Sequence, residues 1–382
     1  MNEASALEAG APEAPRTKQV RQSPLLRAQL TSWSGLLPVL GWLVLAAAQF
    51  GLFWPAVSAI VLIGVVLAAV HHAEVVAHRV GEPFGTLILA LAVTVIESGL
   101  IVSLMLANRE AAVTLARDTV FATGMIILNL LLGLCLVAAA ARREEVRFTR
   151  TGATAALGTL ATLMVLALVL PNYTTTLAGP IYTRTQLAFV SVFLLILYLT
   201  FVFVQTVRNR DYFLPRGDLQ KVPEVHAPPP SQSQAVLSFL FLLVGLVAVV
   251  LMAKSLSPAL EAGVAAAGAP REVVGIVIAA IVLLPESVAA VRAARARRLQ
   301  TSLNLALGSA LATIGLTIPV VAVVSFTLGL PLVLGLDPKS VLLLALSLFV
   351  AALSLARGRV TVLHGAVHLV IFAAYLVTTV IP

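Results

Sequence analysis

Charged residues are scarce in this chain. Asp, Glu, Lys and Arg together make up 11% of its 382 residues, whereas hydrophobic residues make up 60%. A water-soluble surface needs far more charge than this, so the composition excludes a chain of soluble domains. Hydrophobic runs of about 20 residues recur instead, and each is long enough to cross roughly 30 Å of hydrocarbon. The sequence therefore predicts a polytopic membrane protein whose surroundings are the lipid bilayer.

Cysteine is nearly absent as well. Cys135 is the single one, and it lies inside a hydrophobic run. This count excludes an internal disulfide framework and a metal site built from cysteines, and we interpret Cys135 as a small packing residue. The net charge of +8 could suggest a nucleic-acid partner. The basic residues are scattered between hydrophobic runs, however, which is typical of cytoplasmic loops, and we expect no nucleic acid.

Eleven hydrophobic segments are candidate transmembrane helices. Backbone groups in lipid must be paired internally, and for runs of this length the solution is a helix. The fold class that we expect is an all-α polytopic membrane protein. The predicted spans are 34–53, 55–78, 84–107, 113–141, 152–170, 186–207, 234–253, 271–293, 301–328, 338–356 and 360–381.

The basic residues also orient these spans. With the N-terminus in the cytoplasm, six of the 25 Lys and Arg residues fall on the outside, which leaves 19 on the inside. The positive-inside rule favours this orientation, with the C-terminus outside. The six outside residues are Arg109, Arg117, Arg184, Lys254, Arg271 and Lys339.

Polar stretches divide the chain. Residues 1–33 are rich in Ala, Glu and Pro and lack the apolar core of a signal peptide, so we expect a disordered cytoplasmic tail. Residues 208–233 are charged and then rich in Pro, Ser and Gln, which is typical of a cytoplasmic linker. The remaining units are a leading helix, 34–53, and two segments of five spans each, 54–207 and 234–382.

The two five-span segments resemble each other. In each, an acidic residue is followed by a Gly-x-Pro turn and by an apolar run that ends in Glu-Ser, with the glutamates at Glu97 and Glu286. In the next span of each segment a polar residue follows a glycine by five positions. The matching pairs are Glu74 and Glu261, Gly81-Glu82-Pro83 and Gly268-Ala269-Pro270, Gly124 and Gly308, and Asn129 and Thr313.

An odd number of spans per repeat inverts the second copy. The span with Glu97 then runs from inside to outside, and the span with Glu286 runs from outside to inside. This is the inverted-repeat plan of secondary transporters, in which the substrate binds near the midplane at the repeat interface. We expect the two carboxylates to meet at one shared site.

Two buried carboxylates suit ion exchange. An ionisable residue inside the membrane costs about 2.5 kcal/mol or more at the helix centre, so it is a functional candidate by default. Carboxylates that face each other raise each other's proton affinity. Glu97 and Glu286 could then hold either protons or a cation. Hard oxygen ligands of this kind suit Ca²⁺ or Na⁺, and the chemistry requires no cofactor.

Neighbouring residues could complete the site. Thr94 lies one turn before Glu97, and Ser98 and Ser287 offer hydroxyls or act as small packing residues. Pro285 removes a helical hydrogen bond and should free a backbone carbonyl as a further ligand. Supporting positions lie in the following helices. They are Asn129, Ser309 and Thr313, and for Asn129 and Thr313 helix–helix hydrogen bonding is an equal alternative.

Histidines at helical spacing deserve a separate interpretation. The segment HHAEVVAH contains no HExxH motif, so an interfacial cluster or a cytoplasmic pH-sensitive patch is favoured over a zinc site. Glu74 within it could relay protons or cations toward the central site. His364 and His368, in the last span, are interpreted as interfacial packing residues. The histidines of the segment are His71, His72 and His78.

These motifs resemble those of the Ca²⁺/cation antiporter (CaCA) superfamily, in particular its cation/proton exchanger (CAX) family. The chain is similar to bacterial ChaA-type sodium, potassium or calcium/proton antiporters. The A-T-E-E-L-A-like segment, the glycine-rich turn and the G-N-A-x-E motif of the family look like HHAEVVAH, GEPFGTL and VTVIE, and the second G-N-A-x-E looks like VLLPE. The family element G-S-I-L-S-N resembles 124–129, and its partner resembles 308–313.

The resemblance covers nearly everything after residue 35. It implies a sodium/calcium exchanger-like fold with one leading helix and two inverted five-helix repeats. It also implies an inner-membrane antiporter that moves protons in and Ca²⁺, Na⁺ or K⁺ out through Glu97 and Glu286. The Gly-Asn of each motif is replaced here, by Val93-Thr94 and Val282-Leu283. Two amide ligands are therefore missing, with Thr94 as a partial substitute, which makes a monovalent or mixed-ion exchanger credible.

Two other classes remain open. A cation channel could use an inverted pair of glutamates as a selectivity filter, although channels more often build filters by subunit symmetry. An intramembrane metalloenzyme could use the His/Glu segment, although no recognisable ligand spacing supports it. Coupling to protons distinguishes the antiporter from the channel.

Overall fold

Nearly all of the described chain is helical. The computed structural model describes residues 32–81, 84–107, 112–141, 143–214 and 230–381. The predicted N-terminal tail, apart from its last two residues, and most of the predicted linker lie outside these ranges.

The first half of the described chain contains six apolar helical segments. They are α2 (Trp33–Gln49), α3 (Pro55–Val80), α4 (Phe84–Ala107), the segment α5 (Ala112–Met125), η1 (Ile126–Leu131) and α6 (Leu132–Ala140), the segment α7 (Arg150–Met164), η2 (Val165–Val169) and η3 (Leu170–Tyr173), and the segment α8 (Arg184–Phe203) and η4 (Val204–Arg208), followed by η5 (Arg210–Tyr212).

The second half contains five. They are α9 (Gln232–Ala266), α10 (Glu272–Arg295), the segment α11 (Leu299–Ala312), η7 (Thr313–Thr317) and α12 (Ile318–Leu328), then α13 (Pro338–Ala356) and α14 (Val362–Val380). Two short strands, β1 (Val146–Arg147) and β2 (Arg359–Val360), complete the described elements.

The helices confirm the eleven predicted spans. In the described ranges nine segments are long and apolar enough to cross a membrane, and two shorter apolar helices, Trp33–Gln49 and Leu91–Leu106, accompany them. One predicted limit is wrong: the span 234–253 continues as α9 to Ala266. Lys254 follows the predicted limit directly, and the helix passes through it and through Pro258.

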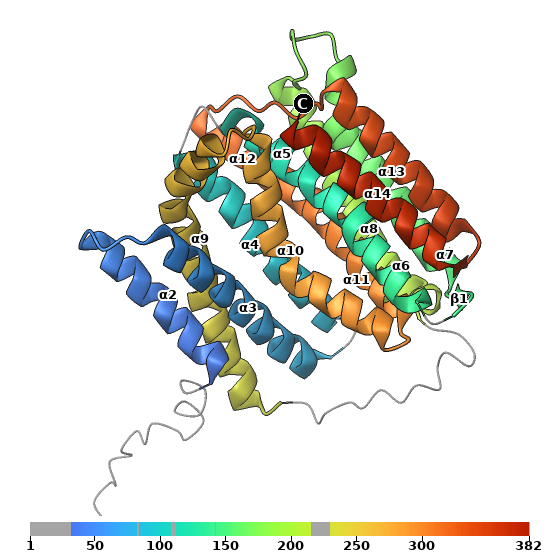
Figure 1. The fold of residues 1–382 in the computed structure, drawn as a ribbon, viewed down its shortest axis with the longest axis horizontal. Helices are drawn as coiled ribbons and strands as arrows, with labels where there is room; N and C mark the ends of the chain where they lie inside the picture. The colour runs from blue at the N-terminus through green and yellow to red at the C-terminus, as the bar shows by residue number, and fades with distance from the viewer. Residues whose placement is uncertain (1–31, 82–83, 108–111, 142, 215–229, 382) are drawn as a thin grey trace, which may run out of the picture.

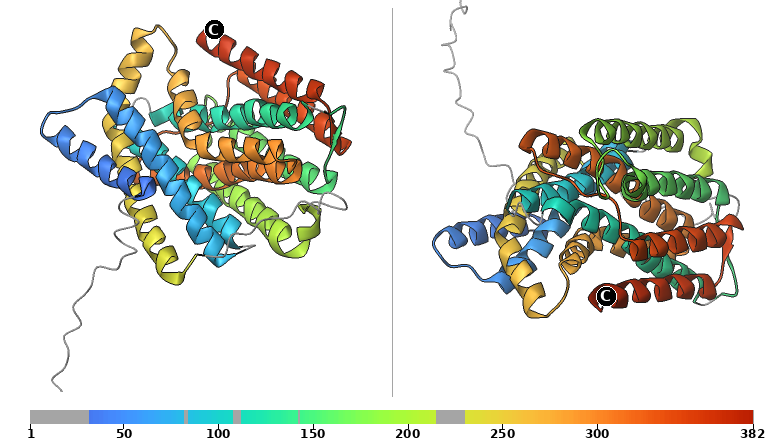
Figure 2. Two further views of the ribbon diagram at one scale, coloured as in Figure 1. Left: turned by 60° about the horizontal axis from the view of Figure 1, so that its bottom comes forward. Right: turned by 90° about the horizontal axis from the view of Figure 1, so that it is seen from above.

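The helices form two groups. Helices α2, α3 and α9 lie along one side of the molecule, in blue and yellow in Figures 1 and 2, and the other helices form the larger body beside them. Helix α3 packs against α9, and α4 packs against both of them. Helix α4 therefore connects the two groups, and it carries Glu97.

The leading helix docks through a histidine. His72 in α3 is fully buried, its Nε2 lies 3.0 Å from the carbonyl oxygen of Ser34 in α2, and its ring stacks on Phe241 of α9. The ring of His71 contacts Trp33. These two histidines thus hold α2 against α3 and α9.

Contacts at the two ends of the bundle reflect the inverted repeats. At one end β1, after α6, pairs antiparallel with β2, before α14. At the other end Ile181, before α8, forms a β-bridge with Val333, after α12. Likewise α14 packs on α6 and η1, while α8 packs on α12 and η7. These two contacts between the repeats are thus each repeated upside down.

Two helices approach closely through glycines. Gly133 of α6 and Gly365 of α14 face each other, and a Cβ built on Gly365 would lie 2.7 Å from the Gly133 carbonyl oxygen and 2.8 Å from the Val137 nitrogen. Small residues let helix backbones pack closely where lipid provides no hydrophobic driving force. The pair sets the spacing between α6 and α14.

Candidate functional site

Glu97 is buried in the middle of α4. Its side chain is 1% exposed, and both carboxylate oxygens accept hydrogen bonds. Thr123 Oγ1 of α5 donates to Oε1 over 3.2 Å, and Thr313 Oγ1 of η7 donates to Oε2 over 2.5 Å. The carboxylate therefore lies between one helix of the first repeat and one of the second.

Glu286 occupies the corresponding place in α10. It follows Pro285, is half-buried, and accepts a hydrogen bond at Oε2 from Ser309 Oγ of α11. Its hydrogen-bond partner, Ser309, lies four residues before Thr313, the partner of Glu97. The structure thus brings together the two glutamates that the repeat suggested.

One helix face holds both carboxylates. Ser309 binds Glu286 and Thr313 binds Glu97, and residues four apart in a helix lie on the same face, one turn apart. The two carboxylates are therefore neighbours, offset along this helix by about one turn, ~5.4 Å. A cation between them would meet carboxylate and hydroxyl oxygens from both repeats.

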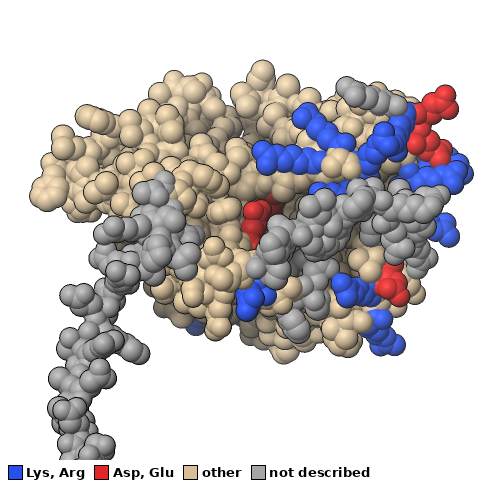
Figure 3. All heavy atoms as spheres, turned by 90° about the horizontal axis from the view of Figure 1, so that it is seen from below, with Lys and Arg blue, Asp and Glu red and all other residues tan. Residues whose placement is uncertain are grey.

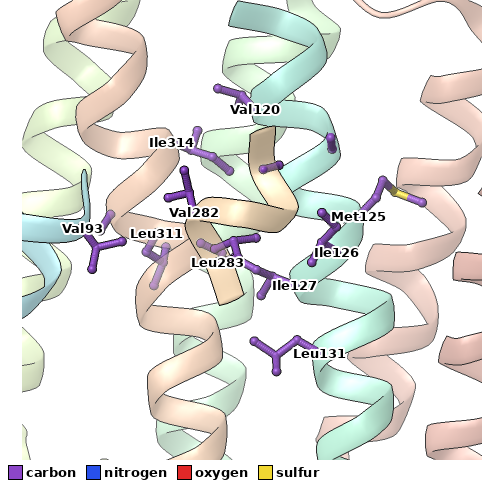
Figure 4. Close-up of a cluster of buried hydrophobic side chains, with 14 of the residues drawn as sticks. Val93, Val120, Met125, Ile126, Ile127, Leu131, Val282, Leu283, Leu311 and Ile314 are labelled. Carbon is purple, nitrogen blue, oxygen red and sulfur yellow. The ribbon is translucent and has the colours of Figure 1, made fainter. Parts of the chain in front are cut away.

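Apolar side chains surround this polar pair. Val93, Val282 and Leu283 are at most 4% exposed, and Figure 4 shows the side chains of α10 packed between those of α11 and η7 on one side and α5 and η1 on the other. Val93 and Val282 stand where the resembling family has the glycine of its motif, and Leu283 stands where it has the second asparagine. Thr94 stands at the first asparagine and keeps a hydroxyl, so the side-chain oxygens near the two glutamates are carboxylates and hydroxyls.

The other predicted ligands are distributed unevenly. Ser98 Oγ donates to the Thr94 carbonyl oxygen over 2.5 Å, which ties the hydroxyl to its own helix. Both residues are buried beside Glu97. Ser287 is half-buried next to Glu286, and Pro285 lies inside a continuous helix. The roles of Thr94, Ser98, Ser287 and Pro285 as ligands stay predictions.

Asn129 belongs to a different cluster. Its Nδ2 donates to Ser347 Oγ of α13 over 2.8 Å, and its Oδ1 lies 3.4 Å from His368 Nδ1 of α14. His368 Nε2 lies 3.2 Å from Ser354 Oγ, and all four residues are buried. Asn129 therefore joins α13 and α14 to η1, as the helix–helix alternative predicted. His368 is fully buried in this cluster and packs between helices, and its place at the membrane interface stays a prediction.

Replacement of Asn129 by Leu separates the two interpretations. A helix–helix role predicts that Asn129→Leu lowers stability by about 1–3 kcal/mol, because Ser347 and His368 lose a buried partner. The cation concentration for half-maximal exchange should stay within about twofold of wild type, since this amide lies outside the carboxylate pair. Thermal stability in detergent and cation titration of transport measure the two effects. A weakened cation affinity at unchanged stability would place Asn129 in the ion site instead.

The segment HHAEVVAH offers no metal site. In the described ranges no group of three His, Cys, Asp or Glu side chains is placed to hold a metal ion. His71 and His72 hold the leading helix against α3. His78 and Glu74 are exposed, and the charge of Arg292 acts on the Glu74 carboxylate. A relay through Glu74 stays a prediction.

Thr123 is a site residue that the sequence reasoning missed. It immediately precedes Gly124, and its hydroxyl contacts Glu97 directly. The repeat comparison passed over it because the matching position in the second half is Leu307, an apolar residue. A polar residue that faces the first glutamate from a neighbouring span was the available signal.

Comparison with known families and relatives extends this picture. The family model described as sodium/calcium exchanger protein matches residues 50–207 and 237–381. The chain is 46% identical over 362 residues to the putative ionic transporter y4hA of Sinorhizobium fredii (strain NBRC 101917 / NGR234), which covers 93% of this chain and 98% of the relative. It is 33% identical over 327 residues to the sodium-potassium/proton antiporter ChaA of Escherichia coli (strain K12), covering 85% and 88%.

Solved structures share the fold. Native YfkE superimposes with a TM-score of 0.69 at 16% identity, covering 91% of this chain and 100% of that one. The H⁺/Ca²⁺ exchanger CAX superimposes with a TM-score of 0.67 at 16% identity, covering 92% and 88%. The same arrangement of helices is thus found in exchangers of distant sequence.

Proposed function

The chain belongs to the sodium/calcium exchanger protein family, and from this premise we propose that it is a cation/proton antiporter that exports Ca²⁺ and/or Na⁺ or K⁺ in exchange for H⁺. Membership makes it a membrane transporter of the exchanger type. The finer proposal concerns the ions and the residues that bind them.

One observation supports the shared site most strongly. Glu97 and Glu286 come from opposite repeats, yet hydroxyls one turn apart on α11 and η7 bind both of them. A single cation can therefore interact with both carboxylates. Protons compete for the same oxygens, because protonation removes the charge that holds the cation.

The ligand chemistry favours a monovalent cation. Carboxylates and hydroxyls are hard oxygen ligands that accept Na⁺, K⁺ or Ca²⁺. Ca²⁺ takes six to eight oxygens. Of the two asparagine positions in the resembling motifs, Leu283 supplies no side-chain oxygen and Thr94 supplies one hydroxyl. The 33% identical relative is named a sodium-potassium/proton antiporter. We therefore propose Na⁺ or K⁺ as preferred substrates, with Ca²⁺ as the weaker one.

Exchange follows by alternating access. In the cycle that we propose, the site opens to one side at a time, and the repeats change position only when the two carboxylates are neutralised by a cation or by protons. Uncompensated charge in the hydrocarbon layer opposes this movement. This coupling makes cation movement depend on proton movement in the opposite direction.

The proposed orientation has the N-terminus in the cytoplasm of a bacterial inner membrane. Lys and Arg side chains gather in one region of the face shown in Figure 3. The connections before and after β1 and β2 carry exposed arginines, as does the connection between α10 and α11. They are Arg143, Arg147, Arg150, Arg295, Arg297, Arg298, Arg357 and Arg359. The positive-inside rule places this end of the bundle in the cytoplasm.

Proton release from acid-loaded inverted vesicles tests the function. Addition of Na⁺, K⁺ or Ca²⁺ to vesicles that contain the protein should release the stored protons, and the active ion identifies the substrate. Because protons and cations compete for the same carboxylates, the half-maximal cation concentration should rise as pH falls, by up to about tenfold per pH unit for each displaced proton. Vesicles from cells without the protein are the control.

The same assay separates the antiporter from a channel. An antiporter lets a cation gradient drive protons even when the membrane potential is collapsed by a permeant anion. A cation channel moves no protons under that condition. Cation flux without proton flux at zero potential would therefore replace the antiporter with the channel, and absence of both fluxes would contradict transport by this site.

A further inference from the structure

Two buried threonine hydroxyls have no partner in the described structure. Thr119 of α5 and Thr317 of η7 are both 0% exposed, and neither Oγ1 has a hydrogen-bond partner among the described residues. Threonines of other helices behave differently: Thr162 of α7 and Thr200 of α8, for example, donate to the carbonyl four residues earlier. Among the described residues, the buried hydroxyls of Ser191 and Ser302 also have no partner, but they lie in α8 and at the start of α11, away from the residues that bind Glu97. Buried polar groups in native proteins are nearly always paired, so two unpaired hydroxyls in lipid-spanning helices require an explanation.

Both hydroxyls are in register with Glu97. Thr119 lies four residues before Thr123, and Thr317 lies four residues after Thr313. Thr123 and Thr313 are the two residues that donate to the Glu97 carboxylate. Residues four apart share a helix face. Thr119 and Thr317 therefore lie about one turn beyond Glu97, on the two helices that flank it.

The two turns lead in the same direction. Helix α5 begins, and α12 ends, at the end of the bundle where α4 ends. Going back along α5 and forward along η7 thus leads to the same side of Glu97, which is the outer side in the proposed orientation. Elements α5 and η7 pack against each other and against α4. Ser309 and Glu286 lie one turn in the opposite direction.

We propose that Thr119 and Thr317 form an outer subsite that holds a partly hydrated cation one helical turn outside Glu97. The inference rests on the proposed function, in which Glu97 binds a cation. Hydroxyl oxygens are hard, neutral ligands, so they suit Na⁺ or K⁺ without neutralising its charge. The ion keeps part of its water shell there and is held weakly. Weak, successive sites allow an ion both to enter and to leave.

Isosteric variants test the subsite. Thr119→Val and Thr317→Val remove only the hydroxyl, whereas Thr119→Ser and Thr317→Ser keep it. Thr200→Val is the matched control, because Thr200 is exposed on α8 and bonded to its own helix. Each protein is reconstituted in one orientation, and half-maximal concentrations of the exchanged cation are measured from the outer and the inner side.

We expect each valine variant to raise the outer half-maximal concentration about three- to tenfold, a modest loss of binding. The inner half-maximal concentration should stay unchanged. In a reversible exchanger the ratio of maximal rate to half-maximal concentration must balance between the two directions, so at an unchanged maximal rate of uptake the maximal rate of cation efflux should fall by the same factor. The serine variants and Thr200→Val should match wild type. Thermal stability of the valine variants should stay within a few degrees of wild type.

Three results would overturn the subsite. Unchanged transport from both sides would make the unpaired hydroxyls structural only, and a rise in stability without a transport effect would support that conclusion. Equal weakening from both sides would place the threonines in support of Glu97 itself. If wild type exchanges no cation for protons, the proposed function fails, and the subsite fails with it; side-independent effects in an active protein overturn the subsite alone.

Discussion

Glu97→Gln and Glu286→Gln are each expected to lower cation-driven proton exchange by at least about 30-fold, because removing one charged partner from a buried site costs about 2–5 kcal/mol. Glutamine keeps the size of the side chain and an oxygen that accepts the hydrogen bond from Thr313 or Ser309. It cannot release a proton or neutralise a cation. The variants should therefore fold and fail in transport.

Glu145→Gln is the matched control for this prediction. Glu145 lies outside the spans, where it forms exposed ion pairs with Arg147 and Arg359 at 3.6 and 3.4 Å. Exposed pairs contribute about 0–1 kcal/mol, so exchange should stay close to wild type. Proton release from inverted vesicles, with protein amounts compared on blots, measures all three variants. Normal exchange by Glu97→Gln or Glu286→Gln would show that the carboxylates are structural.

Gly365→Ala is expected to destabilise the protein by about 1–3 kcal/mol, the usual cost of adding a methyl group to a packed interior. The new Cβ would meet backbone atoms of Gly133 and Val137 within 2.8 Å, so neither neighbour can rotate away. Helices α6 and α14 would have to separate. The contact between Asn129 and His368, which lies about one turn from this glycine pair, would loosen as well.

Gly158→Ala should have the opposite effect. Nothing lies within 4 Å of a Cβ at Gly158, which is exposed on α7. Replacing glycine by alanine inside a helix gains about 0.5–1 kcal/mol. Thermal unfolding of the two variants in the same detergent compares them directly. If Gly365→Ala is as stable as Gly158→Ala, the close approach of α6 and α14 does not contribute to the stability of the fold.

The transmembrane spans could be predicted from composition. Helices that cross lipid are long and apolar, and the turns between them carry the charged residues. The predicted limits 84–107 and 338–356 agree with α4 and α13. The end of α9 did not follow, since a helix that leaves the hydrocarbon layer carries polar residues without breaking. Lys254 and Pro258 both lie inside this helix.

The two glutamates of the candidate site could be predicted from the sequence, but the side chains that hydrogen-bond to them could be predicted only in part. Glu97 and Glu286 stand out because an isolated carboxylate in an apolar run is costly. Asn129 and Thr313 occupy equivalent positions in the repeats, yet Thr313 binds Glu97 and Asn129 binds Ser347. Sequence position cannot distinguish them, because the partner of Asn129 is 218 residues away and is set by how α13 packs.

The offset between Ser309 and Thr313 gives the site an electrical asymmetry. In the site that we propose, a proton that transfers from Glu286 to Glu97 moves along a membrane-spanning helix by about one turn, ~5.4 Å of a layer roughly 30 Å thick. It therefore crosses roughly a fifth of the transmembrane voltage, and because a full crossing is worth about 2.3 kcal/mol per charge at 100 mV, the step is worth about 0.4 kcal/mol. If the proposed site binds protons at both carboxylates, a resting voltage of 100 mV shifts the distribution of a proton between them by about twofold, without any change in their chemistry.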